Sequence, residues 1–397
     1  MKGCVASNTA MLLDRPGSVR GPRWSTLRPI AALALIVAVA PLVTASVTAT
    51  GHGIERGASA SETADRLGRR QITPALPPSA QPVDTSRPDR IIGTGTAASC
   101  TSTGVVAAVA AGGIITFDCG PNPVVIEMHE TAKVVNTSPT VVLDGGGLVT
   151  LSGRDTRRIL YMNTCDPAQI WTTPHCQNQD HPRLTIQNLT FTRGNATGQL
   201  TIDGGGGGGS GGAVYVRGGQ VRILDSVFTS NRCDPTGPDV GGAALRILSQ
   251  FEGGPVIVAG STFGGSPASG NVCSNGGAIS SIGVSWEIYD SEFSHNRASG
   301  SGANPARPGT PGGGNGGAIY LDGNRFTLDL VDSSISDNTA SEGGPAIFFV
   351  SNDRSGELRI TGSELRRNTG ERFGTPGFPG IFFLGRGSPV VTASTIR

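Results

Sequence analysis

The sequence is poor in aromatic and in charged residues, which make up 5% and 15% of its 397 residues. It also lacks a sustained amphipathic helical pattern, and its one helix-favouring run is GVVAAVAA at 104–111. With so few aromatic side chains, a folded core has to be filled mostly by Val, Ile, Leu and Ala. The 60 glycines and 26 prolines follow no collagen-like period, so they favour short strands separated by frequent turns.

The chain has no excess of basic residues once its first segment is set aside. Residues 1–49 hold five basic residues and one acidic residue, and removing them from the totals of 31 and 30 leaves 26 and 29. This slightly negative balance argues against nucleic acid as a partner. It does not favour a strongly polyanionic ligand either, although a sum of charges does not exclude a local basic groove.

Recognisable catalytic and metal-binding motifs are missing as well. No Ser–His–Asp constellation or phosphate-binding loop can be assembled, and the glycine run 204–209 is a low-complexity loop. His175 and His181 lie near Cys176, but this spacing matches no zinc pattern. We therefore expect neither a metal nor a cofactor, with calcium considered only under the lyase alternative given below.

Two short motifs alternate through the second half of the chain. A GGA-type motif begins at residues 211, 241, 276, 316 and 343, so successive motifs are 30, 35, 40 and 27 residues apart. Such irregular spacing does not fit a helical repeat, but it fits coils that have strands of fixed length and loops of variable length. The second motif is an apolar residue, two others and asparagine; it ends at Asn231, Asn296, Asn338 and Asn368. We predict an all-β fold, a parallel β-helix.

Aligning the coils on the second motif predicts two columns of equivalent residues. Stacked coils lie about 4.8 Å apart, so an apolar column fills the core. Its members are Phe191, Phe228, Phe263, Phe293, Ile335, Leu365 and Ile396. Three residues earlier stands a column suited to turns, whose members are Asn188, Asp225, Gly260, Asp290, Asp332, Gly362 and Ala393. At roughly 25 to 30 residues per coil, the chain from Ile114 to its end forms about ten coils.

The amino-terminal region has the features of an export signal. Its basic stretch precedes the apolar run 30–43 and the small residues Ala45 and Ala49, which is typical of a cleaved signal peptide spanning 1–49. The alternative is an uncleaved membrane anchor, since the apolar stretch extends to about 20 residues. Residues 50–95 are rich in Pro, Ser, Ala and Arg, and we expect a disordered linker. The β-helix domain then spans 96–397, with a short helix at 104–111 covering its first coil.

The cysteines agree with export to an oxidising compartment. Cys4 lies in the segment expected to be removed, which leaves six cysteines. Cys233 and Cys273 each follow an asparagine by two residues on neighbouring coils, so we expect them to form a disulfide. The simplest remaining pairs are sequence neighbours, Cys100 with Cys119 and Cys165 with Cys176. We expect a secreted or cell-surface protein without stable membrane insertion after signal cleavage.

The alternating tetrapeptides resemble the repeats of the polymorphic outer membrane protein family. GGAV or GGAI occurs at Gly211, Gly276 and Gly316, and FTSN and FSHN begin at Phe228 and Phe293. The resemblance covers the chain from residue 184 to its end. It implies a right-handed parallel β-helix with an adhesin-like role. The region from residue 100 through LDGGG at 143–147 is similar to the leading coils of the wider pectin-lyase-like superfamily. Members of the family end in an outer-membrane barrel, whereas this chain ends inside a repeat, so translocation by its own barrel is not implied.

A secreted polysaccharide lyase or glycoside hydrolase is the alternative to a binding protein. Its best catalytic candidates are Asp290 and Asp332, which are equivalent residues on adjacent coils with retaining-glycosidase spacing. The same column also accepts glycine, however, so we interpret both aspartates as turn residues. An enzyme requires three carboxylates, or carboxylates with arginine, that converge in a groove.

The function expected from the sequence is recognition of a glycan or another cell-envelope component. The long insertions fall between the asparagine of one coil and the next GGA motif, so the loops should project from one side of the scaffold, where binding commonly occurs. Arg193, Arg232 and Arg297 lie at the base of these loops and are the binding candidates.

Overall fold

The computed structural model describes residues 76–199, 208–370 and 372–397. The fold described below is that of these residues, which all lie within the unit Arg70–Arg397. The signal peptide expected at 1–49 and the first part of the expected linker, 50–75, lie outside the described residues. Within those residues, no helix combines the length and the apolar character needed to cross a membrane.

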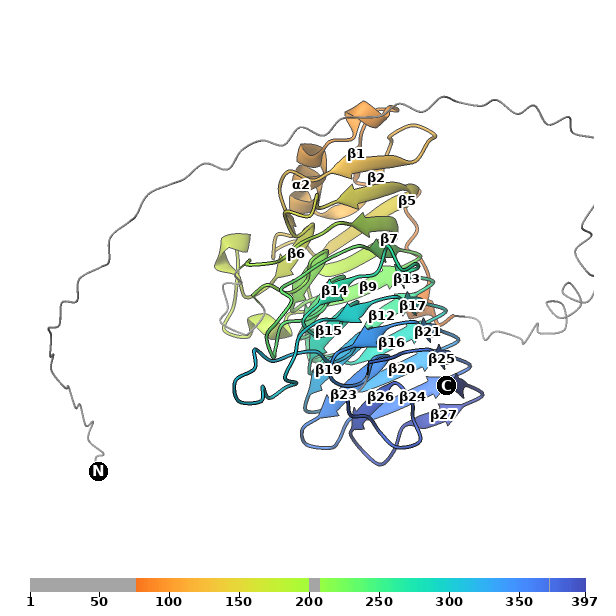
Figure 1. Cartoon of the computed structure of the whole chain (residues 1–397). Helices are drawn as coiled ribbons and strands as arrows, with labels where there is room; N and C mark the ends of the chain where they lie inside the picture. Colours follow the sequence, from red (N-terminus) through yellow and green to blue (C-terminus); the bar gives the residue numbers. More distant parts are fainter. Residues whose placement is uncertain (1–75, 200–207, 371) are drawn as a thin grey trace, which may run out of the picture. The chain divides into compact units, whose positions relative to one another are not determined.

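The described chain is mostly β, and its strands form three sheets of 17, 8 and 3 strands (Figure 1). The 17-stranded sheet contains two stacks of parallel strands, which the long strands β5 (Thr140–Ser152) and β7 (Arg183–Thr192) join. The first stack also contains β1 (Arg90–Ile92), β2 (Gly113–Phe117), β9 (Gln220–Leu224), β12 (Val256–Ala259), β16 (Trp286–Tyr289), β20 (Thr327–Val331), β24 (Glu357–Thr361) and β27 (Val390–Thr392). The second stack also contains β3 (Val124–Glu127), β10 (Val227–Thr229), β13 (Thr262–Gly264), β17 (Glu292–Ser294), β21 (Ser334–Ser336), β25 (Glu364–Arg366) and β28 (Thr395–Ile396).

The other two sheets are also parallel, and the helices are few and short. The 8-stranded sheet consists of β4 (Ala132–Lys133), β6 (Leu160–Asn163), β8 (Val214–Arg217), β11 (Leu245–Leu248), β15 (Ile279–Ile282), β19 (Ile319–Gly323), β23 (Ile347–Ser351) and β26 (Ile381–Leu384). The 3-stranded sheet consists of β14 (Val272–Cys273), β18 (Arg297–Ala298) and β22 (Thr339–Ala340). The helices are η1 (Pro78–Ala80), η2 (Ala97–Ser99), α2 (Ser102–Ala111), η3 (Pro167–Gln169), η4 (Cys176–Asn178) and η5 (Phe251–Gly253).

The predicted apolar column is present; its first six members are buried and Ile396 is partly buried. Strand pairing places its seven members opposite one another in sequence order, from Phe191 to Ile396. The rings of Phe191, Phe228, Phe263 and Phe293 stack nearly parallel, with centroids 5.1, 5.0 and 4.5 Å apart. Because the strands are in register, one residue type repeated along the chain produces a continuous apolar row through the core.

The column three residues earlier forms the corner between the two stacks, as predicted. All seven of its members have positive φ, between 43° at Asp290 and 62° at Gly362. Glycine adopts this left-handed backbone freely, and among L-residues mainly Asn and Asp do so, which explains the restricted composition of the column. The exception is Ala393, with φ 50°.

Two rows of buried polar side chains connect the strands. In the first, the amide of each asparagine donates to the carboxamide oxygen of the next, at 2.8–3.0 Å, from Asn231 through Asn271, Asn296 and Asn338 to Asn368. In the second, the hydroxyl oxygen of one serine accepts from the backbone N–H of the preceding serine; the pairs run through Ser226, Ser261, Ser291, Ser333, Ser363 and Ser394. These rows satisfy backbone groups at the corners, where the strand ladders stop.

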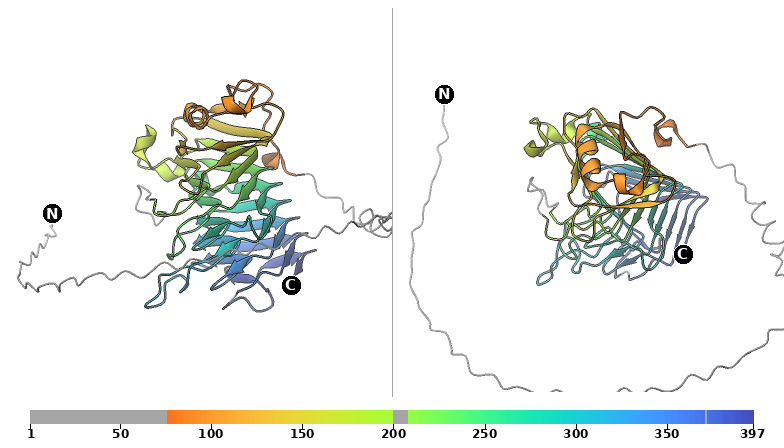
Figure 2. Two further views of the ribbon diagram at one scale, coloured as in Figure 1. Left: turned by 45° about the horizontal axis from the view of Figure 1, so that its top comes forward. Right: turned by 90° about the horizontal axis from the view of Figure 1, so that it is seen from above.

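Part of the segment expected to be a disordered linker is structured. Residues 76–95, which fall in the expected linker, contain η1 and β1, and β1 pairs in parallel with β2. The predicted helix is confirmed as α2, which buries Val105 and Val109 in the core beside β1 and β2 (Figures 1 and 2). An isolated strand of three residues has a weak sequence signal, so β1 was missed.

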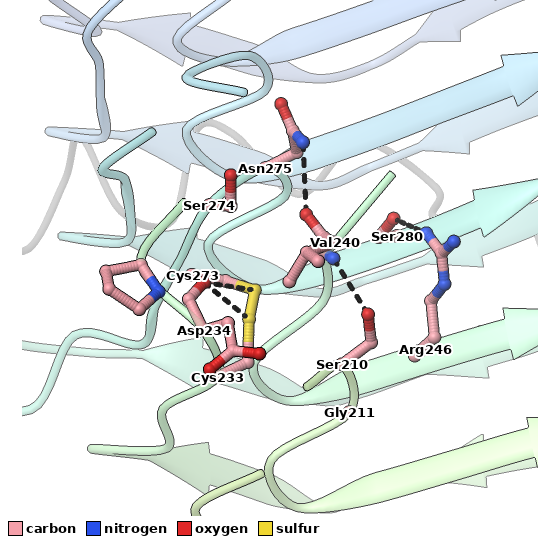
Figure 3. Close-up of a disulfide and its surroundings, with 12 residues drawn as sticks. Ser210, Gly211, Cys233, Asp234, Val240, Arg246, Cys273, Ser274, Asn275 and Ser280 are labelled. Carbon is pink, nitrogen blue, oxygen red and sulfur yellow. Dashed lines mark hydrogen bonds between the residues drawn. A yellow bond between two sulfur atoms is a disulfide. The ribbon is translucent and has the colours of Figure 1, made fainter. Parts of the chain in front are cut away.

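The three disulfides pair as expected. Cys100–Cys119, Cys165–Cys176 and Cys233–Cys273 have Cα separations of 5.7, 4.9 and 4.8 Å, inside the range that a disulfide requires. Figure 3 shows the third bridge beside Asp234; close to it the Asn275 amide donates to the Val240 carbonyl at 3.0 Å. Three bridges indicate an oxidising environment.

The apolar column predicts a large difference between two substitutions. Phe293→Ala removes a ring that is fully buried and stacked on Phe263, so it should lower the free energy of unfolding by roughly 3 to 5 kcal/mol. Val390→Ala truncates a side chain that is 57% exposed and should change it by less than about 0.5 kcal/mol. Urea denaturation of both variants measures the difference, and equal stabilities would contradict the assigned column.

Candidate functional site

The outer face of the first stack carries a column of mostly polar side chains. In-register pairing aligns Thr185, Arg222, Ile257, Glu287 and Asp329 across β7, β9, β12, β16 and β20. Alternate residues of these strands face the core and solvent, so this column lies on the outside. Long polar side chains on adjacent strands therefore converge on one surface.

Two adjoining grooves lie on this face. The larger holds about 480 Å³ and is lined by Val83, Ile114, Thr140, Val142, Arg183, Leu184, Thr185, Gln220 and Arg222. The smaller holds about 260 Å³ and is lined by Ser79, Gln220, Val221, Arg222, Gln250, Phe251, Gly254, Pro255 and Ile257. Gln220 and Arg222 line both. We refer to the two together as the Arg222 groove.

Arg222 is a partly buried cation that lacks an anionic partner among the described residues. Its guanidinium donates to the Thr185 hydroxyl at 3.2 and 3.3 Å and to the Ser79 carbonyl at 3.3 Å. Burial lowers the pKa of the Arg222 guanidinium, and no carboxylate contact opposes this shift. A buried charge without a counter-charge is costly, so the groove is suited to an anionic group supplied from outside.

Arg183 and Gln220 extend the polar wall of the groove. Arg183 donates to the Asp180 carboxylate at 3.3 Å, with its side chain largely exposed. Gln220 donates to the Asp180 carbonyl at 3.0 Å. The groove therefore combines guanidinium, carboxamide and hydroxyl groups with an apolar floor, as binding sites for polar ligands usually do.

The amino-terminal segment 76–85 forms one side of the groove. The carboxamide of Gln187 holds this segment by accepting from the Val83 N–H at 2.9 Å and donating to the Val83 carbonyl at 3.0 Å. The Thr85 hydroxyl donates to Asp144 at 2.6 Å. Ala80 packs against a small apolar cluster on β9 and β12 (the orange segment beside the strands in Figure 1). Without this segment the groove would lack a wall.

Asp144 is the electrostatic anchor of that wall. Burial by itself raises the pKa of its carboxyl, but hydrogen bonds from Thr85, Gln187, the Gly146 N–H and Asn188 outweigh burial and leave the pKa below the usual 3.8. The charged form is thus the one that the folded protein stabilises.

A second polar cluster lies farther along the same face. Arg359 binds Asp329 through two hydrogen bonds of 2.5 and 2.8 Å and Glu357 through one of 2.5 Å. Tyr289 donates to Glu287 at 3.0 Å; burial, followed by this carboxylate, raises the Tyr289 pKa to about 12. Carboxylates and an arginine do converge here, but Asp329 and Glu357 already pair with Arg359, and Glu357 also pairs with Arg386.

The catalytic candidates chosen from the sequence are corner residues in the structure. Asp290 and Asp332 have φ of 43° and 47°, and they follow strands β16 and β20, which are neighbours. Neither lines the Arg222 groove. In the described parts of the chain, no three His, Cys, Asp or Glu side chains come together as a metal site would require.

The three arginines expected to bind a ligand are not brought together in one site. Arg193 pairs with Asp155 at 2.8 Å, and both this hydrogen bond and the opposite charge raise its pKa. Arg232 and Arg297 are exposed and occupy one backbone column, with Val272 between them. None of them lines the Arg222 groove.

The loop at 297–315 is fastened to the scaffold at its tip. The Asn304 amide donates to the Tyr320 hydroxyl of β19 at 2.7 Å, and Arg307 makes two hydrogen bonds of 2.8 and 2.9 Å to the buried Glu342. The loop at 297–315 thus covers part of the 8-stranded sheet, which reduces the surface that the loop can offer to a ligand. In the same sheet, Arg246 of β11 is fully buried and donates to the Ser280 hydroxyl (Figure 3).

The residues of the Arg222 groove have no motif in the sequence. Arg183 and Thr185 come from β7, and Gln220 and Arg222 stand 37 residues later on β9. The wall comes from a segment with no strong pattern. The groove residues can be identified only when the register of the strands is known, because they are polar residues at equivalent positions of consecutive strands.

Comparison of the chain with known protein families, with curated proteins and with solved structures found no match.

The lowered pKa of Asp144 predicts how stability depends on pH. A carboxyl with a lower pKa in the folded than in the unfolded chain adds stability above the unfolded value of 3.8, and this part is lost as pH falls through the folded pKa. Asp144→Asn should therefore destabilise the protein at pH 6 and have a much smaller effect at pH 3. Urea denaturation at both pH values, with Asp290→Asn as the control, measures this. An equal loss at both would contradict the assignment.

Proposed function

We propose that this chain is an exported, right-handed parallel β-helix that binds a carboxylate-bearing glycan in the Arg222 groove. The single observation that carries the ligand class is the partly buried guanidinium of Arg222, which has no carboxylate partner among the described residues. Its neighbours Gln220, Thr185 and Thr140 offer the donors and acceptors that sugar hydroxyls need.

The strand order supports a β-helix. From β11 to β22 the chain visits the 8-stranded sheet, the first stack, the second stack and the 3-stranded sheet three times in this order, with parallel pairing each time. Ten strands follow one another in the first stack: β1, β2, β5, β7, β9, β12, β16, β20, β24 and β27. Crossover connections between parallel strands are almost always right-handed.

The disulfides and the amino-terminal sequence support export. Three bridges persist only where thiols are oxidised, and the signal-like segment 1–49 would direct the chain there. A rigid parallel scaffold with a lateral groove is suited to attachment at a cell surface, where acidic polysaccharides present carboxylates in quantity. The role proposed is therefore adhesin-like binding.

The binding test compares one oligosaccharide in two charge states. Calorimetry with hexagalacturonate and with its fully methyl-esterified form should show tighter binding of the acid. Arg222→Ala should weaken binding of the acid about 10- to 100-fold, because a charge-assisted hydrogen bond contributes about 1.5–3 kcal/mol. Arg325→Ala removes the same charge from an exposed position outside the groove and should leave the affinity unchanged. Equal binding of both sugars, or no effect of Arg222→Ala, would refute the proposal.

The cluster around Arg359 supports a second candidate function, polysaccharide cleavage. Glu287, Asp329 and Glu357 lie on the same outer face, and Tyr289 is a candidate proton-transfer group. Under this alternative the protein should release unsaturated or reducing ends from polygalacturonate, and Asp329→Asn should abolish release while binding persists. Binding without any product after prolonged incubation would instead favour the binding role.

A further inference from the structure

The loop between β6 and β7 carries the most exposed large apolar side chains of the described residues outside the strands. Ile170 is 73% exposed and Trp171 is 38% exposed. The disulfide Cys165–Cys176 closes the loop, which extends sideways from the sheets in Figures 1 and 2 (yellow-green). A disulfide-closed loop presents such side chains without the entropy cost of ordering a flexible one.

The Trp171 side chain is held in a fixed orientation. One side of its indole stacks on the His181 ring, with centroids 5.6 Å apart and planes 10° from parallel. His181 is fixed in turn by Asp180, whose carboxylate lies 2.6 Å from its Nδ1. The Asn136 amide donates to the Trp171 carbonyl at 2.7 Å, so the backbone is held as well. The indole is thus a rigid surface that remains partly open to solvent.

The backbone at this loop tip is strained. Ile170 has φ 76°, a left-handed conformation that costs a β-branched residue more than most. Strain of this kind persists only where the surroundings enforce it, and it is concentrated at ligand-binding positions.

The indole is connected to the Arg222 groove through a short chain of contacts. Asp180 touches His181 on one side; on the other it accepts from Arg183, which lines the groove. Gln220, which lines it too, donates to the Asp180 carbonyl. Asp180 and His181 thus link Trp171 to two residues of the groove wall.

We propose that Trp171 is a stacking platform for a sugar ring of the glycan that occupies the Arg222 groove. This inference rests on the proposed function and deepens it, because it requires an oligosaccharide that spans both positions. The apolar C–H face of a pyranose packs on the open face of the indole, while the ring hydroxyls stay in water or meet the polar groups beside it. Arg222 supplies selectivity for the carboxylate, and Trp171 supplies contact area that is independent of charge.

Tryptophan fluorescence reports on this contact directly. The chain has three tryptophans, of which Trp286 is fully buried and Trp24 lies in the expected signal peptide. Quenching by acrylamide in the exported protein should therefore come mainly from Trp171. Hexagalacturonate should protect the Trp171 fluorescence from acrylamide. The Trp171→Phe variant should lose the quenchable fluorescence, which identifies Trp171 as its source.

Affinity variants separate this inference from the proposed function. Trp171→Ala should weaken hexagalacturonate binding about tenfold, and it should weaken binding of the methyl-esterified sugar by the same factor, because stacking does not depend on the charge. Trp171→Phe keeps an aromatic ring, so it should lose less affinity than Trp171→Ala. Val125→Ala, which truncates an apolar side chain that is 58% exposed on β3, is the control and should change nothing.

The outcomes that overturn the inference differ from those that overturn the proposed function. If the sugar binds through Arg222 while Trp171→Ala has no effect and quenching stays unprotected, the platform is refuted and the function stands. If Trp171→Ala abolishes attachment only to protease-sensitive cell surfaces, the platform serves a polypeptide and the inference is again wrong. If the wild-type protein binds neither sugar, both fail.

Discussion

In-register parallel pairing places each side chain directly against the side chain at the same position of the next strand, and the rest of the structure depends on this constraint. It stacks Phe191, Phe228, Phe263 and Phe293 inside the protein. It also aligns the asparagines and the serines, so that hydrogen bonds run from one member of each row to the next. A shift of one residue would turn the apolar column outwards and break both polar rows. The apolar column and the two polar rows therefore each oppose a change of register.

The same register that builds the core also builds the outer surface. Because Thr185 and Arg222 occupy one column on neighbouring strands, the hydroxyl of one is placed to accept from the guanidinium of the other. Segment 76–85 then partly encloses Arg222 and raises the cost of leaving its charge unpaired. In this account, a rigid scaffold and one fastened segment convert a surface arginine into a site with a preference for anions.

Much of the fold could be predicted from the sequence, because each column repeats along the chain. The apolar column, the left-handed corner and the Cys233–Cys273 bridge depend on equivalent positions, so aligning the repeats is sufficient to find them. The other two cysteine pairs are predicted only as sequence neighbours. The groove depends on Val83, Asp144, Gln187 and Arg222, which are far apart in the sequence and occur once each. Contacts of that kind leave no periodic signal. The serine row did leave one, directly after the corner, but its hydroxyls look like ordinary surface residues until the strands are stacked.

The central claim is that Arg222 receives a carboxylate from outside the protein. A crystal structure of the protein with hexagalacturonate bound tests it most directly. The account predicts a uronate carboxylate within hydrogen-bonding distance of the Arg222 guanidinium, between β7, β9 and the segment 76–85. A sugar bound elsewhere, with the guanidinium still bonded only to Thr185 and Ser79, would contradict it.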